Sequence, residues 1–195
     1  MNLPNKITMT RIFLTPFIIL FFLLPIPYGI GKFIALFLFI LASLSDLIDG
    51  KIARKYNLIT NFGKFMDQIA DKFVATTAII LILFFGIMPA WCASLILIII
   101  CCRDTLVGGI RQVAAAAGNV IPADKFGKFK SLFLDSSSMV LMLYIGLVCA
   151  DVDVVILMNI IYYTGIVLLG IGTLLTIISG INYTIKALPY LKESK

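Results

Sequence analysis

Several apolar runs of nearly 20 residues dominate this sequence. Apolar residues make up 61% of its 195 residues and charged residues only 13%, whereas soluble domains are about half apolar. A transmembrane helix needs about 20 consecutive, mainly apolar residues. The chain is therefore predicted to be an all-α integral membrane protein that forms a single domain over residues 1–195.

Turn-forming residues divide the chain into six predicted transmembrane helices. These spans cover about residues 12–28, 31–57, 62–87, 89–117, 129–150 and 154–187. Residues 1–11 are expected to form a short interfacial helix, with Lys6 and Arg11 reaching lipid headgroups. No small-residue cleavage site follows the first apolar run, so a cleavable signal peptide is not expected.

Basic residues are distributed unevenly among the predicted turns. With both termini in the cytoplasm, every one of the 16 lysines and arginines except Lys32 would face the cytosol. The positive-inside rule therefore predicts an even number of spans and two cytoplasmic termini. The net charge of +6 would then face anionic membrane lipids and phosphorylated metabolites. There is no basic soluble segment to hold nucleic acid, so a nucleic-acid partner is not expected.

Four aspartates stand where the second and third predicted spans meet. Asp46 and Asp49 are three residues apart, so they share one helix face. Asp67 and Asp71 are four apart and share another. Four like charges so close would repel each other unless cations neutralised them, and hard carboxylate oxygens in a chain without histidine favour Mg²⁺ or Mn²⁺. Helix capping or pairing with a lysine is the alternative for any single aspartate.

Small and basic residues complete this acidic frame. Gly50 and Gly63 remove side-chain bulk where a ligand could come close. Arg54 lies one turn beyond Gly50 and could hold a phosphate by paired hydrogen bonds. The whole frame reads Asp46-x2-Asp49-Gly50-x2-Ala53-Arg54-x8-Gly63-x3-Asp67-x3-Asp71.

The frame resembles the signature of the CDP-alcohol phosphotransferase family at every fixed position. Members of that family are membrane enzymes with six spans that transfer a phosphatidyl or similar group from a CDP-linked lipid to an alcohol and release CMP. The resemblance implies that the four aspartates bind one or two divalent ions and that Asp71 deprotonates the acceptor hydroxyl. It also implies a homodimer, and a site for the CDP lipid lined by Gly50, Ala53, Arg54 and Gly63.

A second polar set, later in the chain, is basic and comprises Arg103, Arg111, Lys128 and Lys130. Arg103 and Arg111 are two helical turns apart and roughly 80° around the helix, so they can converge on one cavity. Four converging cations indicate an anionic acceptor, most simply a phosphate. The alternative is that Lys128 and Lys130, together with Lys125, anchor their helix at lipid headgroups.

These later motifs and the first 11 residues resemble those family members that use sn-glycerol 3-phosphate as the acceptor. The resemblance implies that CDP-diacylglycerol is the donor, that phosphatidylglycerol phosphate is the product, and that Arg103, Arg111, Lys128 and Lys130 hold the acceptor phosphate. It places the enzyme in a bacterial cytoplasmic membrane, with its active site facing the cytosol.

Three questions stay open at this point. Inositol phosphate is an alternative acceptor because it also carries a phosphate. A cation transporter would explain the aspartates, but it would not explain Arg54 or the basic set. Asp135, inside the fifth predicted span, either lines the acceptor cavity or pairs with a basic residue.

Overall fold

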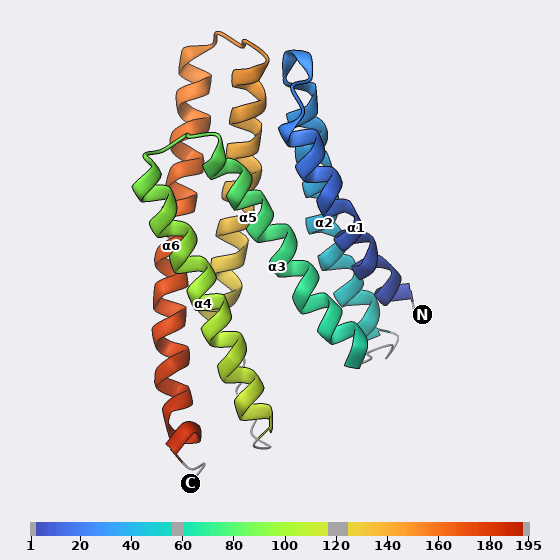
Figure 1. The fold of residues 1–195 in the computed structure, drawn as a ribbon, viewed down its shortest axis with the longest axis vertical. Helices are drawn as coiled ribbons and strands as arrows, with labels where there is room; N and C mark the ends of the chain where they lie inside the picture. Colours follow the sequence, from blue (N-terminus) through green and yellow to red (C-terminus); the bar gives the residue numbers. More distant parts are fainter. Residues whose placement is uncertain (1–2, 56–60, 117–124, 193–195) are drawn as a thin grey trace. The chain divides into compact units, whose positions relative to one another are not determined.

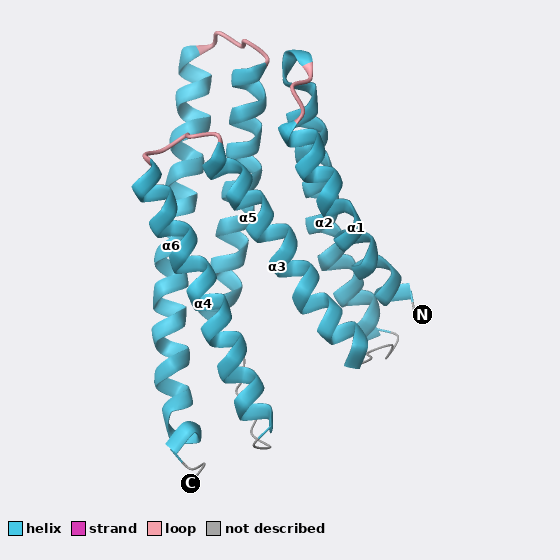
Figure 2. Cartoon of the chain, in the orientation of Figure 1, coloured by secondary structure: helices cyan, strands magenta, loops and turns pink. Residues whose placement is uncertain are grey.

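Helices account for most of the computed structural model of the chain, which describes residues 3–55, 61–116 and 125–192. Side chains are described for residues 5–46, 63, 65–114 and 126–187. The elements are α1 (Leu3–Leu23), η1 (Pro27–Gly29), α2 (Ile30–Lys55), α3 (Asn61–Phe84), α4 (Ala90–Ala116), α5 (Lys125–Cys149) and α6 (Val155–Lys192) (Figure 1). In these residues Figure 2 shows helices and short loops but no strand. The all-α prediction is confirmed.

Each predicted span corresponds to one helix, and the clearest difference lies at the amino terminus. Helix α1 runs without a break from Leu3 to Leu23, so the prediction of a separate interfacial helix over residues 1–11 is wrong. Pro4 lies in the first turn of α1, where its missing N–H group costs the helix no hydrogen bond. The segment therefore continues into the first span.

Five of the helices described are long and apolar enough to cross a membrane, and α3 is the exception. Every stretch of 18 residues within α3 contains Asp67, Asp71 and Lys72, which are too many charges for an ordinary span. The charged residues of α3, which include two of the predicted metal ligands, are thus also the ones that separate α3 from the other five long helices. The sixth span stays a prediction.

The chain forms two compact units, which are described here one at a time. The first unit comprises Met1–Ile87 and Ser138–Gly165, and the second comprises Met88–Ser137 and Ile166–Lys195. Helices α1, α2 and α3 belong to the first unit and α4 to the second. Helices α5 and α6 contribute one part to each.

In the described part of the first unit, α1 packs along both α2 and α3, whereas α2 and α3 touch each other at few positions. Small residues on α2 and α3 allow this close approach: Ala35, Ala42, Ala70 and Ala78 are all fully buried. The buried face of α1 is polar near its start and apolar near its end, and comprises Asn5, Thr8, Arg11, Thr15, Ile18 and Phe22.

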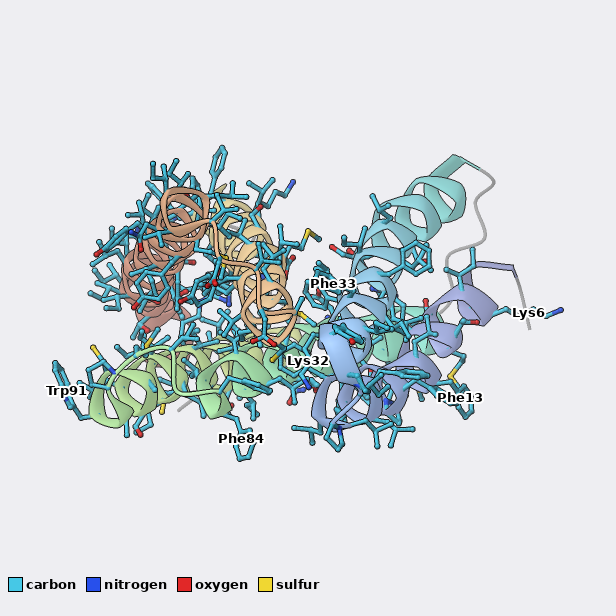
Figure 3. All side chains as sticks on the ribbon, turned by 90° about the horizontal axis from the view of Figure 1, so that it is seen from above. Lys6, Phe13, Lys32, Phe33, Phe84 and Trp91 are labelled. Carbon is cyan, nitrogen blue, oxygen red and sulfur yellow. The ribbon has the colours of Figure 1, made fainter. Side chains whose placement is uncertain are left out.

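At the far end of these three helices, Lys32 is buried inside the first unit. Its Nζ donates a hydrogen bond of 3.1 Å to the carbonyl oxygen of Leu24 and lies 5.5 Å from the centroid of the Phe85 ring. The same carbonyl, just after α1, also accepts a hydrogen bond of 2.9 Å from the backbone N–H of Ile26. Figure 3 shows Lys32 within the helices, while Lys6 and Phe13 point away from them.

The turn between α1 and α2 packs closely against the part of α5 that belongs to the same unit. Gly29 has a positive φ of 65°, a conformation that favours glycine. A Cβ atom at this position would lie 2.4 Å from the carbonyl oxygen of Gly146. Gly29 is therefore required both by its backbone conformation and by its neighbour.

The second unit has its own buried contacts among α4, α5 and α6. Ile100, Val107 and Ala114 recur every seven residues along the buried face of α4. A Cβ atom on Gly172 of α6 would lie 2.8 Å from the side chain of Leu134 on α5. These contacts hold the helices that carry the basic residues described below.

Two glycines with positive φ provide a matched test of the packing at the η1 turn. Gly86 has a φ of 67°, but a Cβ atom there would meet nothing within 4 Å. We expect Gly86→Ala to lower the free energy of unfolding by about 1 kcal/mol through backbone strain. Gly29→Ala should lower it by a further ~1–3 kcal/mol through overpacking. Thermal unfolding of the purified protein in detergent measures both, and equal effects would contradict the packing at Gly29.

Candidate active site

The acidic frame lies in helices, as the spacing predicted. Helix α2 continues through Lys55 and includes Asp46 and Asp49, while α3 includes Asp67 and Asp71. Asp49, Gly50, Ala53 and Arg54 lie outside the residues whose side-chain surroundings the structure describes, so their roles stay predictions. Gly63, near the start of α3, is partly buried.

Arg11 joins the two acidic helices. Its guanidinium donates one hydrogen bond to Asp46 of α2 and another, of 2.6 Å, to Asp67 of α3. The side chain of Arg11 is only 2% exposed, whereas those of Asp46 and Asp67 are 38% and 51% exposed. A buried arginine thus bridges carboxylates that remain accessible from outside.

This position of Arg11 corrects the prediction that it reaches lipid headgroups. A buried guanidinium is stable only when its charge is paired, and the carboxylates of Asp46 and Asp67 pair it through hydrogen bonds from its two Nη atoms. A sequence signal for this did exist. Asn5, Thr8, Arg11 and Thr15 follow each other at helical spacing and continue into the buried Ile18 and Phe22, which indicates one inward face.

The described acids do not by themselves form a metal site. Among the described side chains, no group of three acids, cysteines or histidines is close enough together to hold an ion. Asp71, on the same helix as Asp67, is exposed. Asp46 and Asp67 do direct carboxylate oxygens at one cation, the guanidinium of Arg11. Two of the four predicted ligands are therefore brought together.

The basic set lies in the second unit, where Asp104 links two of its members. Asp104 accepts a hydrogen bond of 3.0 Å from its neighbour Arg103 on α4 and another from Lys130 on α5. The side chains of Arg103 and Lys130 are 14% and 8% exposed. Burial of this kind speaks against a headgroup anchor at Lys130, whereas Lys128 is exposed.

Arg111, two turns beyond Arg103 on α4, contacts α6 instead. Its Nε donates a hydrogen bond of 2.7 Å to the hydroxyl of Tyr183, and its guanidinium carbon lies 5.0 Å from the centroid of that ring. Arg103 also reaches α6, where it donates to the hydroxyl of Ser179. Both arginines could be recognised in the sequence, whereas Ser179 and Tyr183 could not, because a hydroxyl inside a long apolar helix carries no distinctive pattern.

Comparison with known proteins agrees with the motif. The family model for CDP-alcohol phosphatidyltransferase matches residues 1–178. A Rickettsia bellii protein named CDP-diacylglycerol–glycerol-3-phosphate 3-phosphatidyltransferase is 36% identical over 184 residues, which cover 93% of each chain. A Bacillus subtilis protein of the same name is 41% identical over 140 residues, or 67% of this chain and 70% of that protein.

A third relative, from Mycobacterium tuberculosis, is named as a probable phosphatidylglycerophosphate synthase. It is 32% identical over 192 residues, which cover 96% of this chain and 82% of that protein. With the family model matching nearly the whole chain, this protein belongs to the CDP-alcohol phosphatidyltransferase family.

The ion pairs of Arg11 can be tested in protein treated with a chelator, so that no bound metal contributes. We expect Arg11→Gln to lower the free energy of unfolding by about 1–3 kcal/mol. This is less than the ~3–5 kcal/mol for breaking a fully buried pair, because the two carboxylates are partly exposed. Lys6→Gln, at an exposed position of α1, serves as the control and should change stability by no more than about 0.5 kcal/mol. Equal stability of the two variants would refute the bridging role of Arg11.

Proposed function

We propose that this chain transfers the phosphatidyl group of CDP-diacylglycerol to sn-glycerol 3-phosphate, giving phosphatidylglycerol phosphate and CMP. The observation that carries the proposal is the similarity over nearly the full chain to a protein named for this reaction. The buried cluster of Arg103, Asp104 and Lys130 supports it, because a phosphorylated acceptor needs cations that are held in place.

The choice of acceptor rests on two kinds of support. The basic cluster favours a phosphorylated alcohol over a neutral one, but it suits inositol phosphate as well as glycerol 3-phosphate. The printed names of the relatives from Bacillus and Rickettsia specify glycerol 3-phosphate. Glycerol 3-phosphate is therefore the acceptor that we propose. Membership of a transferase family leaves no specific support for a cation transporter.

We further propose that Asp46, Asp49, Asp67 and Asp71 hold one or two Mg²⁺ or Mn²⁺ ions. The chemistry of the donors fits, because hard cations prefer carboxylate oxygens, and Asp46 and Asp67 already share one positive group. Bound metal would supply neutralisation of charge on the diphosphate. Gly50, Ala53, Arg54 and Gly63 would line the site for the CDP lipid, with Arg54 bonding a phosphate.

In the proposed reaction the protein binds and orients both substrates and moves one proton. The acceptor hydroxyl oxygen forms a bond to the phosphorus of the phosphatidyl group, and the bond from that phosphorus to the oxygen of CMP breaks. The carboxylate of Asp71 takes the hydroxyl proton as general base. Arg103, Arg111, Lys128 and Lys130 hold the phosphate of glycerol 3-phosphate, and most of the rate enhancement comes from this positioning.

We also propose that the helices cross the membrane in the predicted arrangement. Helix α3 would be the sixth span, both termini would lie in the cytoplasm, and the active site would open to the cytosol. The distribution of lysines and arginines supports this orientation. This orientation requires α3 as a sixth span, in addition to the five helices of membrane-spanning length among the described residues. The acids of α3 would then lie at the cytoplasmic edge of the bilayer. We also propose a homodimer, on the basis of the family resemblance.

Replacement of the proposed base tests the catalytic part of the account. We expect Asp71→Asn to reduce the rate of CMP release by at least about 100-fold, the lower end for loss of a general base, with little change in thermal stability because the residue is exposed. Asp153→Asn, at an exposed position in the loop before α6, is the control and should keep normal turnover. Normal turnover of purified Asp71→Asn would exclude Asp71 as the base.

Replacement of Arg111 tests the acceptor part separately. We expect Arg111→Ala to raise KM for glycerol 3-phosphate on the order of tenfold or more, since a hydrogen bond to a charged group contributes about 1.5–3 kcal/mol. KM for CDP-diacylglycerol should change little. The adjacent Gln112→Ala, also exposed on α4, should leave both constants unchanged. Steady-state kinetics with each substrate varied in turn gives both values, and an unchanged acceptor KM would move the phosphate site elsewhere.

A further inference from the structure

One turn of α6, Ser179 to Tyr183, contacts both arginines that α4 contributes to the basic set. Figure 1 shows α4 and the end of α6 side by side, and both segments belong to the second unit. Ser179 is fully buried and Tyr183 is 1% exposed. Ser179 accepts a hydrogen bond from Arg103, and Tyr183 accepts one from Arg111.

Arg103 lies in a slot beside two glycines, and Gly180 is the one that keeps the slot open. A Cβ atom on Gly180 of α6 would lie 3.1 Å from Cγ of Arg103, and one on Gly127 of α5 would lie 3.4 Å from its Nη2. By contrast, a Cβ atom on Gly170 of α6 would meet nothing within 4 Å. Gly180 thus lies where α6 passes the side chain of Arg103, and its lack of a side chain leaves room for the arginine. Asp104 holds the same guanidinium at its Nη1 atom.

Tyr183 holds Arg111 in two ways. Its hydroxyl oxygen accepts from Nε at 2.7 Å, and its ring lies 5.0 Å from the guanidinium carbon, within the range of a cation–π contact. Arg111 itself is exposed. The guanidinium is therefore fixed by a buried partner while the residue still faces the outside, as a group that binds a ligand should be.

The two arginines contact positions of α6 that lie closer together along their helix than the arginines do along α4. Arg103 and Arg111 are eight residues apart on α4, or about 12 Å along a helix, whereas Ser179 and Tyr183 are four residues apart on α6, or about 6 Å. Two long side chains that start about 12 Å apart thus end on a single turn of the neighbouring helix. A single phosphate bound by both guanidiniums requires such convergence.

We propose that Ser179, Gly180 and Tyr183 form an arginine-positioning turn, which sets the location of Arg103 and Arg111 for the phosphate of the acceptor. The inference rests on the proposed function and deepens it. These three residues are positioning residues, because they act through the arginines and need not touch the reacting atoms. The turn would make the enzyme selective for a phosphorylated alcohol by fixing two donors at one distance.

Tyr183→Phe is the main test, because it removes the hydroxyl and keeps the ring. We expect KM for glycerol 3-phosphate to rise roughly three- to tenfold, with kcat and KM for CDP-diacylglycerol within about twofold of wild type. Tyr183→Leu, which also removes the ring, should raise the acceptor KM further. Tyr163→Phe, on an exposed part of α6, is the matched control and should change none of the three constants.

A pair of glycine variants tests the slot independently of the hydroxyls. Gly180→Ala crowds Arg103 and should raise the acceptor KM, while Gly170→Ala, in open space on the same helix, should not. Alanine favours helix formation over glycine at both positions. A rise in the acceptor KM with Gly180→Ala alone would therefore result from crowding of Arg103 and not from a change in the stability of the helix.

The outcomes separate this inference from the proposed function. If wild-type protein releases no CMP with any acceptor, the proposed function fails and the inference fails with it. If wild type is active but Tyr183→Phe and Gly180→Ala keep the wild-type acceptor KM, only the inference is overturned. A rise in both KM values together with lower thermal stability would mean that the turn has a structural role alone, which also overturns it.

Discussion

The cost of placing charge among apolar helices determines how this protein is organised. A buried guanidinium is tolerated only with carboxylate partners, and Arg11 finds one on each of the helices that flank α1. Among the residues that the structure describes, α2 and α3 touch each other little, so that in this part of the chain α1 and its arginine form the main link between the two acidic helices. The ion pairs therefore connect the packing of the first unit with the carboxylates that we assign to catalysis.

The same constraint operates in the second unit. There Lys130 is buried and Arg103 is largely buried, and Asp104 is the carboxylate that both contact. The hydroxyls of Ser179 and Tyr183 accept hydrogen bonds from Arg103 and from the exposed Arg111. Asp104 compensates part of the charge of Arg103 and Lys130 without removing their net attraction for an anion. The acidic residues, which suit a metal ion and a diphosphate, thus lie on different helices from the basic residues, which suit a phosphate. Each set has hydrogen-bond partners on neighbouring helices.

Much of this could be predicted from the sequence, because apolar runs and turn residues locate helices and the aspartate frame is highly specific. Contacts between segments that are far apart in the sequence could not be predicted. The position of Arg11 depends on which face of α1 turns inward, and the polar start of that face resembled an interfacial segment. Ser179 and Tyr183 gain their roles only when α6 packs against α4. Helix α3 shows the opposite case, since the charges that make it conspicuous in the sequence also separate it from the five described helices that are apolar enough to cross a membrane.

Release of CMP by the purified protein tests the central claim most directly. The protein would be incubated with CDP-diacylglycerol and Mg²⁺, together with glycerol 3-phosphate, glycerol or inositol phosphate in separate reactions. The account predicts CMP with glycerol 3-phosphate and none above background with the other two acceptors. Release with inositol phosphate or glycerol in preference to glycerol 3-phosphate would contradict the assigned acceptor. No release with any acceptor, in either Mg²⁺ or Mn²⁺, would contradict the assigned reaction.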